Sequence, residues 1–191
     1  YFFGKGQAEG ADKTKNLLGG KGLGLAKMAA AGVAVPPGFT ITAEVCNYFM
    51  QHEDYPEGLN DEVAENVERL EKTMEAGLGD RGNPLLVSVR SGAAISMPGM
   101  MDTILNLGIN DDVVNGLAEK TGNERFAWDS YRRFIQMFGN VAMGIPGEKF
   151  EEAMEGQKEE RAKKDKRDPQ EVQDVDLTTE DLGKLVERFK K

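Results

Sequence analysis

The fold of this chain depends most on residues 86–103, which read LVSVRSGAAISMPGMMDT. The first residues are apolar enough for a short strand that is buried on both faces, and Arg90 stands where that strand ends. Small residues, glycines, a proline and methionines follow. This order suits a phosphate ligand, because the strand places a cation at its tip and glycines let the backbone approach the ligand closely. The stretch therefore predicts a phosphate-binding edge.

Two features of this stretch have alternative interpretations. Arg90 could form an ordinary surface ion pair, although the apolar Val89 before it and the small residues after it disfavour that interpretation. The methionines Met97, Met100 and Met101 could pack on an adenine ring or fill a core, and core packing is the favoured interpretation.

The composition limits the classes of function. The chain has 191 residues, enough for one large domain or two small ones, and 39% of them are hydrophobic, enough for a core. The net charge of −9 argues against general binding of nucleic acid, because phosphate contacts come from Lys and Arg, but a local positive pocket could hold one nucleotide. No apolar run is long enough to span a membrane, and no secretory leader is apparent. Because the sequence starts at Tyr1, we expect a fragment of a longer protein.

The chain has one cysteine and one histidine. With Cys46 as its single cysteine, the chain can form no internal disulfide, which fits a reducing compartment. The apolar helical pattern around Cys46 predicts a buried, inert thiol. His52 alone cannot form a histidine metal cluster and is expected at the surface. No acidic pair in a strand context suits Mg²⁺, so the sequence predicts neither a metal site nor a catalytic residue within these residues.

A second glycine-rich stretch occupies residues 16–28 and reads NLLGGKGLGLAKM. Its glycines surround Lys21 just before an apolar helical pattern that should end at Gly32. A glycine-rich turn that leads into a helix exposes backbone N–H groups and the positive end of the helix dipole, and both favour anions. The stretch matches neither the P-loop pattern nor the dinucleotide pattern G-x-G-x-x-G. Phosphate binding and simple tight packing therefore stay equally open on spacing alone.

The first part of the chain should mix strands and helices. Residues 1–3 are expected to form an edge strand, and residues 39–42 and 103–108 two further strands. Thr42 should cap a helix that reaches residue 51, and Asn60 should cap the helix that follows.

The second part of the chain should be helical. Asn110 should cap a helix to about residue 120, and residues 124–138 should form a helix whose aromatic face is core. That face comprises Phe126, Trp128, Tyr131, Phe134, Ile135 and Phe138. Arg132 and Arg133 lie about 100° apart on this helix, so at most one should face a given neighbour. A charged helix (148–164), a solvated loop at about 163–176 and a final helix opened by a capping box at residues 178–181 should follow.

These elements predict an α+β protein with an α/β subdomain over residues 1–109 and an all-helical subdomain over residues 110–191. Lys21 and Arg90 are the cations placed where the backbone becomes irregular. Lysine offers a point charge to a phosphate and arginine a fork of donors. Together with a glycine-rich loop, they would form one half of a phosphoryl-transfer site.

Four blocks of the sequence closely resemble the N-terminal region of the pyruvate, phosphate dikinase family. They are Asn16–Gly22, Ser88–Ala93, Ser96–Gly108 and Tyr131–Met137. The related phosphoenolpyruvate synthases share the Ser-Val-Arg-Ser start of the second block but not the continuation from Ser96. The third block therefore distinguishes the dikinase from its relatives.

The resemblance implies a partial ATP-grasp nucleotide-binding domain. The family's enzymes convert ATP, phosphate and pyruvate to AMP, pyrophosphate and phosphoenolpyruvate through a phosphohistidine. The resemblance implies ATP or phosphate contacts at residues of both glycine-rich stretches: Lys21, Arg90, Gly92, Gly99, Met101 and Thr103. It makes Arg133 a further candidate for contact with phosphate or a partner domain.

Other parts of the family's machinery are expected outside residues 1–191. These are the Mg²⁺ ligands, the remaining ATP-grasp subdomain, the phosphohistidine domain and the pyruvate-binding barrel. We therefore expect no turnover by this chain alone. The resemblance implies a homodimeric parent in the cytoplasm, or in the plastid stroma of a plant, with no nucleic-acid or membrane partner. Two alternatives stay open: a phosphoenolpyruvate synthase-like dikinase and a non-catalytic helical interaction module.

Overall fold

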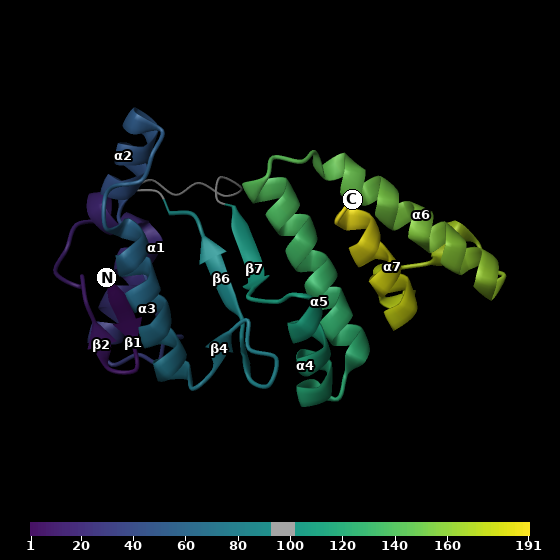
Figure 1. Ribbon diagram of the computed structural model, residues 1–191, viewed down its shortest axis with the longest axis horizontal. Coiled ribbons are helices and arrows are strands. Elements are labelled where there is room, and N and C mark those ends of the chain that lie inside the picture. Colours follow the sequence, from purple (N-terminus) through teal and green to yellow (C-terminus); the bar gives the residue numbers. More distant parts are fainter. Residues whose placement is uncertain (93–101) are drawn as a thin grey trace. The chain divides into compact units, whose positions relative to one another are not determined.

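The computed structural model describes residues 1–92 and 102–191 of the chain, and Figure 1 labels its main elements. Packing divides the chain into two compact units. The first comprises Tyr1–Ala76 and Arg90–Asp102, and the second comprises Gly77–Val89 and Thr103–Lys191. Helices combined with small sheets make the chain an α+β protein. The subdomain boundary predicted between residues 109 and 110 stays a prediction.

A three-stranded antiparallel sheet forms the base of the first unit. Its strands are β1 (Phe2–Gly4), β2 (Gln7–Ala8) and β3 (Gly38–Phe39), in the order β2-β1-β3. The expectation of an edge strand at residues 1–3 is therefore wrong. The side chains of Phe2 and Phe3 are buried, which explains why β1 takes the central place.

Helix α1 (Lys15–Ala30) packs on β1 and β2 of this sheet. Its buried residues Leu18, Gly22 and Ala26 recur every four positions, so they lie on one face of the helix. After the helix ends, Gly32 adopts the left-handed conformation expected of it, with φ of +77°.

Two more helices complete the first unit. Helix α2 (Ala43–His52) has no buried residue, and its Cys46 is exposed. The prediction of a buried thiol is therefore wrong, because no described residue of the unit covers Cys46 enough to bury it. Helix α3 (Leu59–Met74) begins after Gly58 rather than at a cap formed by Asn60, which lies inside the first turn.

The second unit contains two pairs of short strands. Strands β4 (Gly77–Leu78) and β5 (Pro84–Leu85) are parallel, and β6 (Val87–Arg90) pairs with β7 (Thr103–Leu107). Strand β6 is not buried on both faces as predicted, since 48% of Val89 is exposed. The reason is that β6 belongs to a sheet of only two strands.

Helices fill the rest of the second unit, and residues 110–191 contain helical elements alone. The α-helices are α4 (Asp111–Thr121), α5 (Glu124–Met137), α6 (Gly147–Asp165) and α7 (Thr179–Phe189). A π-helical turn, η1 (Phe138–Ala142), follows α5, and two 3₁₀ turns, η2 (Pro169–Glu171) and η3 (Asp174–Asp176), precede α7. The predicted caps at Asn110 and Thr178 are confirmed, since both side chains accept backbone N–H bonds.

Helix α5 is central to the second unit and packs against α4, α7 and β7. Most of its predicted apolar face lies in or against the core, including the buried Tyr131 and the partly buried Trp128. Phe126 and Phe138, however, are 49% and 38% exposed, so this part of the prediction is wrong. Both residues lie at the ends of the helix, where fewer neighbours cover it.

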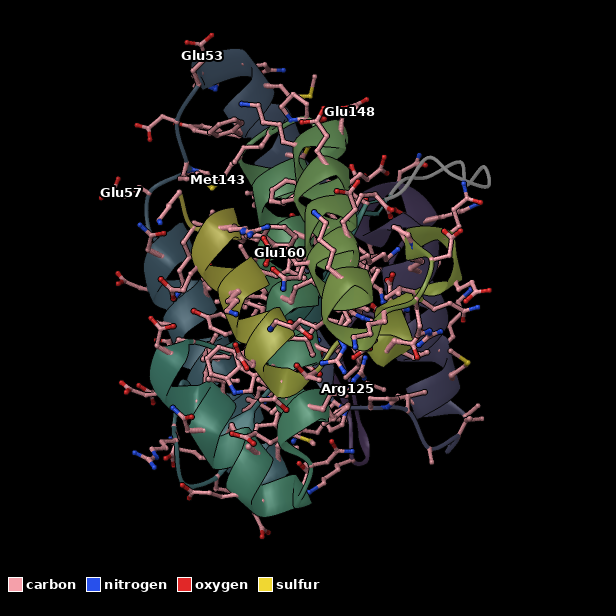
Figure 2. All side chains as sticks on the ribbon, turned by 90° about the vertical axis from the view of Figure 1, so that its right-hand side faces the viewer. Glu53, Glu57, Arg125, Met143, Glu148 and Glu160 are labelled. Carbon is pink, nitrogen blue, oxygen red and sulfur yellow. The ribbon has the colours of Figure 1, made fainter. Side chains whose placement is uncertain are left out.

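The segment between α6 and α7 is better anchored than a solvated loop. Helix α6 extends to Asp165, and Val172 is buried. The Arg125 side chain, labelled in Figure 2, donates to the backbone carbonyls of Leu177 and Asp174 at 2.8 and 2.7 Å. Most other residues of 163–176 are exposed, as expected of a solvated segment, but the carbonyl of Asp174 also serves as an acceptor for Arg125 of α5.

Candidate nucleotide-binding site

The first segment of the candidate site is the broken N-terminal part of α1. The Thr14 side chain caps the helix by accepting the N–H of Leu17. After one turn, Gly19 interrupts the helix with φ of +70° and ψ of 168°, a conformation that favours glycine. The helix resumes directly afterwards, so Lys21 lies in the first turn of its longer part.

This geometry refines the sequence prediction for Lys21. A turn was expected before the helix, whereas the structure places a single glycine break inside it. The first turn of a helix presents backbone N–H groups and a positive dipole end, which favour an anion. Lys21 is exposed and forms no ion pair with any other residue that the structure describes. Its charge is therefore available to a ligand.

The buried side of this turn makes a close contact with Thr40. Gly22 is buried, and a Cβ atom built on it would lie 2.8 Å from both Oγ1 and Cγ2 of Thr40. Nothing in the sequence around Thr40 distinguishes it from the other residues of the strand predicted at 39–42. A glycine at a buried helical position was the available signal, because it often marks a close approach of another segment.

The second segment of the candidate site connects β6 to β7. Arg90 is exposed at the end of β6, and Gly92 is exposed with open space where a side chain would be. The N–H and Oγ of Ser91 donate to the carbonyl oxygen of Asp102 at 3.1 and 3.2 Å. These bonds join the two ends of the intervening segment. Thr103 begins β7 and is partly buried.

The structure groups some of the predicted residues and separates others. Lys21, Arg90 and Gly92 belong to the first compact unit, whereas Thr103 belongs to the second. Gly99 and Met101 lie outside the described residues.

Arg133, the further candidate, lies on α5 in the second unit. Its Nε donates to Asp129 at 2.9 Å, and 58% of its side chain is exposed. The neighbouring Arg132 is buried and contacts the other oxygen of Asp129 at 2.6 Å. The expectation that only one of the two arginines faces a given neighbour is therefore wrong. Asp129 precedes them by three and four residues, so its two oxygens reach both side chains.

A separate surface cavity of about 490 Å³ lies in the second unit. Arg81 and Lys120 line it, but both are engaged: Arg81 pairs with Glu119 at 2.9 Å, and Lys120 donates to the side-chain oxygen of Asn83. None of the predicted site residues lines this cavity. Among the described residues, no three His, Cys, Asp or Glu side chains are grouped as a metal would require. None of the helices there combines the length and apolar character needed to cross a bilayer.

Comparison with known proteins agrees with the geometry at α1. Residues 15–71 match the family described as pyruvate phosphate dikinase, AMP/ATP-binding domain. The whole chain is 54% identical to chloroplastic pyruvate, phosphate dikinases of Flaveria trinervia and Arabidopsis thaliana, and 52% identical to that of Zea mays. In each case it covers 19% of the relative's length. The chain is therefore similar along its whole length to pyruvate, phosphate dikinases, and it spans about a fifth of the length of the curated relatives it matches.

Proposed function

We propose that this chain is the ATP- and phosphate-binding part of a pyruvate, phosphate dikinase. Such an enzyme converts ATP, phosphate and pyruvate to AMP, pyrophosphate and phosphoenolpyruvate through a phosphohistidine. The observation that carries the proposal is the position of Lys21, an exposed cation in the first helical turn after the Gly19 break. This turn lies inside the region that matches the AMP/ATP-binding domain.

The chemistry of the site follows from its donors. The Lys21 ammonium and the N–H groups of its helical turn would neutralise phosphate charge without forming a covalent bond. Arg90 would add a planar fork of donors. Phosphoryl transfer depends mainly on such positioning and charge stabilisation.

The segment from Gly92 to Thr103 would close over the phosphates. Gly92 and Gly99 would let the backbone approach them, and Met101 and Thr103 would complete the contacts. Arg133 is a further contact for phosphate or a partner domain. The Ser91–Asp102 hydrogen bonds hold the two ends of this segment together, which supports its assignment as a ligand-binding loop.

The Mg²⁺ ligands, the rest of an ATP-grasp domain and the phosphohistidine domain would be supplied by parts of the parent enzyme outside this chain. The parent enzyme would be a homodimer. Its location would be the plastid stroma, as the names of the chloroplastic relatives indicate, or the cytoplasm.

Substitution of the two cations tests the proposal. In a full-length dikinase that contains this chain, Lys21→Ala and Arg90→Ala should each lower kcat/KM for ATP by roughly a hundredfold, because phosphate charge loses a positioned partner. Lys27→Ala is the matched control, since Lys27 is an exposed lysine in the last turn of the same helix. Normal steady-state kinetics in both site variants would show that the site assignment is wrong.

The requirement for inorganic phosphate tests the second substrate. We expect formation of pyrophosphate to depend on added phosphate in the full-length enzyme. Phosphoenolpyruvate formation that proceeds without phosphate and yields no pyrophosphate would instead indicate a synthase that uses water.

A further inference from the structure

Gly22 and Thr40 form an unusually close approach between α1 and the chain after β3. A Cβ atom at residue 22 would lie 2.8 Å from two atoms of the Thr40 side chain, a separation that real Cβ atoms essentially never show. The backbone at Gly22 has no positive φ, so its conformation would accept alanine. The requirement for glycine therefore comes from the contact with Thr40.

Two backbone hydrogen bonds to Tyr1 hold Thr40 in place. Its backbone N–H donates to the carbonyl of Tyr1 at 2.8 Å, and its carbonyl accepts from the amino group of Tyr1 at 3.1 Å. These bonds continue the pairing of β1 with β3. The side chain is β-branched and therefore stiff about χ1. The backbone and the side chain of Thr40 are therefore both fixed where α1 packs against them.

Lys21 directly precedes Gly22 in the same helical turn. Gly22 lies on the buried face of the helix with Leu18 and Ala26, whereas Lys21 is exposed beside it. The separation of α1 from the Thr40 side chain therefore determines how far the Lys21 backbone and the N–H groups of its turn lie from the sheet.

We propose that Gly22 and Thr40 are a positioning pair for the phosphate-binding turn of α1. Their contact fixes the distance of this turn from the sheet, so that Lys21 can reach the ligand. This inference rests on the proposed ATP site at Lys21. Neither residue needs to touch the nucleotide. Catalytic geometry is sensitive to displacements of about 1 Å, so a shift of this turn should weaken the binding of ATP.

A pair of alanine substitutions in one helix gives the first test. In the full-length enzyme, Gly22→Ala should raise the dissociation constant of ATP–Mg²⁺ by roughly tenfold, because the new methyl group displaces the turn. Gly24→Ala is the matched control, since its Cβ would meet no atom within 4 Å. Both substitutions raise helix propensity equally. Gly24→Ala should therefore leave the dissociation constant unchanged.

Rescue and non-additivity distinguish positioning from general damage. Thr40→Ala removes the two atoms 2.8 Å from the new Cβ and leaves only the Thr40 Cβ at 3.4 Å, an ordinary contact. Gly22→Ala/Thr40→Ala should therefore bind ATP within about twofold of Thr40→Ala alone. If Gly22 acts partly through Lys21, adding Gly22→Ala to Lys21→Ala should weaken binding by a smaller factor than Gly22→Ala does alone. Melting temperatures of all variants show whether each one is folded. If Gly22→Ala does not fold, Thr40→Ile crowds the same contact from the opposite side and should weaken binding equally.

The outcomes separate the two proposals. If Gly22→Ala binds ATP normally while Lys21→Ala does not, the positioning pair is wrong and the ATP site stands. A lack of rescue by Thr40→Ala also overturns the pair. Normal binding by Lys21→Ala would instead overturn the proposed ATP site.

Discussion

The two compact units of this chain bury their apolar residues to different extents. In the second unit, α5 is packed by α4, α7 and β7, and the two core clusters include fully buried residues such as Val113 and Leu182. In the first unit, α2 buries no residue, and Phe49 and Met50 are 43% and 76% exposed. The second unit therefore depends mainly on apolar packing. The first depends more on close contacts at glycine, such as that of Gly22 with the Thr40 side chain, and on polar contacts between its segments.

The two units should differ most in the stability that is lost when an apolar side chain is replaced by alanine. Leu182→Ala in α7 should destabilise the chain by about 2–5 kcal/mol, because it leaves a cavity at a fully buried position. Met50→Ala in α2 should change stability by less than about 0.5 kcal/mol, since this side chain is largely exposed. Urea denaturation of both variants measures the two effects. Equal losses would mean that α2 is covered by a partner or that the core of the second unit is loose.

A smaller effect is expected from the buried carboxylate of Asp181, which completes the capping box of α7. It accepts bonds from the N–H and hydroxyl of Thr178 at 3.0 and 2.7 Å and from the amide of Gln157 at 3.0 Å. Asp181→Ala should cost about 2–3 kcal/mol in urea denaturation, because charge-assisted bonds and a cap are lost together. Glu187→Ala, an exposed acidic residue of the same helix, is the control. A loss similar to that of the control would contradict the buried network.

The Asp181 carboxylate should also make the stability of the chain depend on pH. Burial alone would raise the pKa of Asp181, but the hydrogen bonds from Thr178 and Gln157 outweigh it and lower this pKa below its ordinary value of 3.8. A lowered pKa stabilises the folded state above the unfolded pKa, and the stabilisation is lost as the pH falls through the folded pKa. We therefore expect Asp181→Asn to reduce the loss of stability below about pH 4. Identical acid unfolding curves for both proteins would contradict this assignment.

Arg125 should have a more moderate effect, because it joins α5 to the segment before α7 by two hydrogen bonds to backbone carbonyls. Arg125→Ala should destabilise the chain by about 1–2 kcal/mol and speed hydrogen exchange in residues 169–178. Arg125→Lys keeps the charge but not the two-pronged geometry, so it should recover only part of the loss. Unchanged exchange in that segment would show that it is held by other contacts.

The smallest effect on stability is expected at Cys46. Its thiol is exposed on α2 and should react with a neutral maleimide under native conditions without prior unfolding. The melting temperature should change little, because Cys46 is exposed and α2 has no buried residue. Mass spectrometry and thermal unfolding measure the two quantities. Labelling that requires denaturant would mean that this face is covered.

Local sequence signals predicted much of the helical part of the fold. The caps at Asn110 and Thr178 and the helix that begins near Glu124 are confirmed, since polar caps and apolar periodicity act within a few residues. Within the candidate site, the sequence indicated that Lys21 and Arg90 stand beside irregular backbone. The break at Gly19 and the contact with Thr40 were not predictable, because they depend on how α1 rests on a sheet formed by distant residues.

The sequence by itself determined the similarity to pyruvate, phosphate dikinases, the α+β class and the presence of two glycine-rich stretches with a cation in each. These properties depend on residue identity and short-range order. Only the tertiary structure decided which apolar residues are covered: it left Cys46, Val89 and Phe126 exposed. It also decided that Thr40 lies against Gly22. Burial and close approach depend on neighbours that are remote along the chain, and periodicity shows that a face is apolar without showing what lies against it.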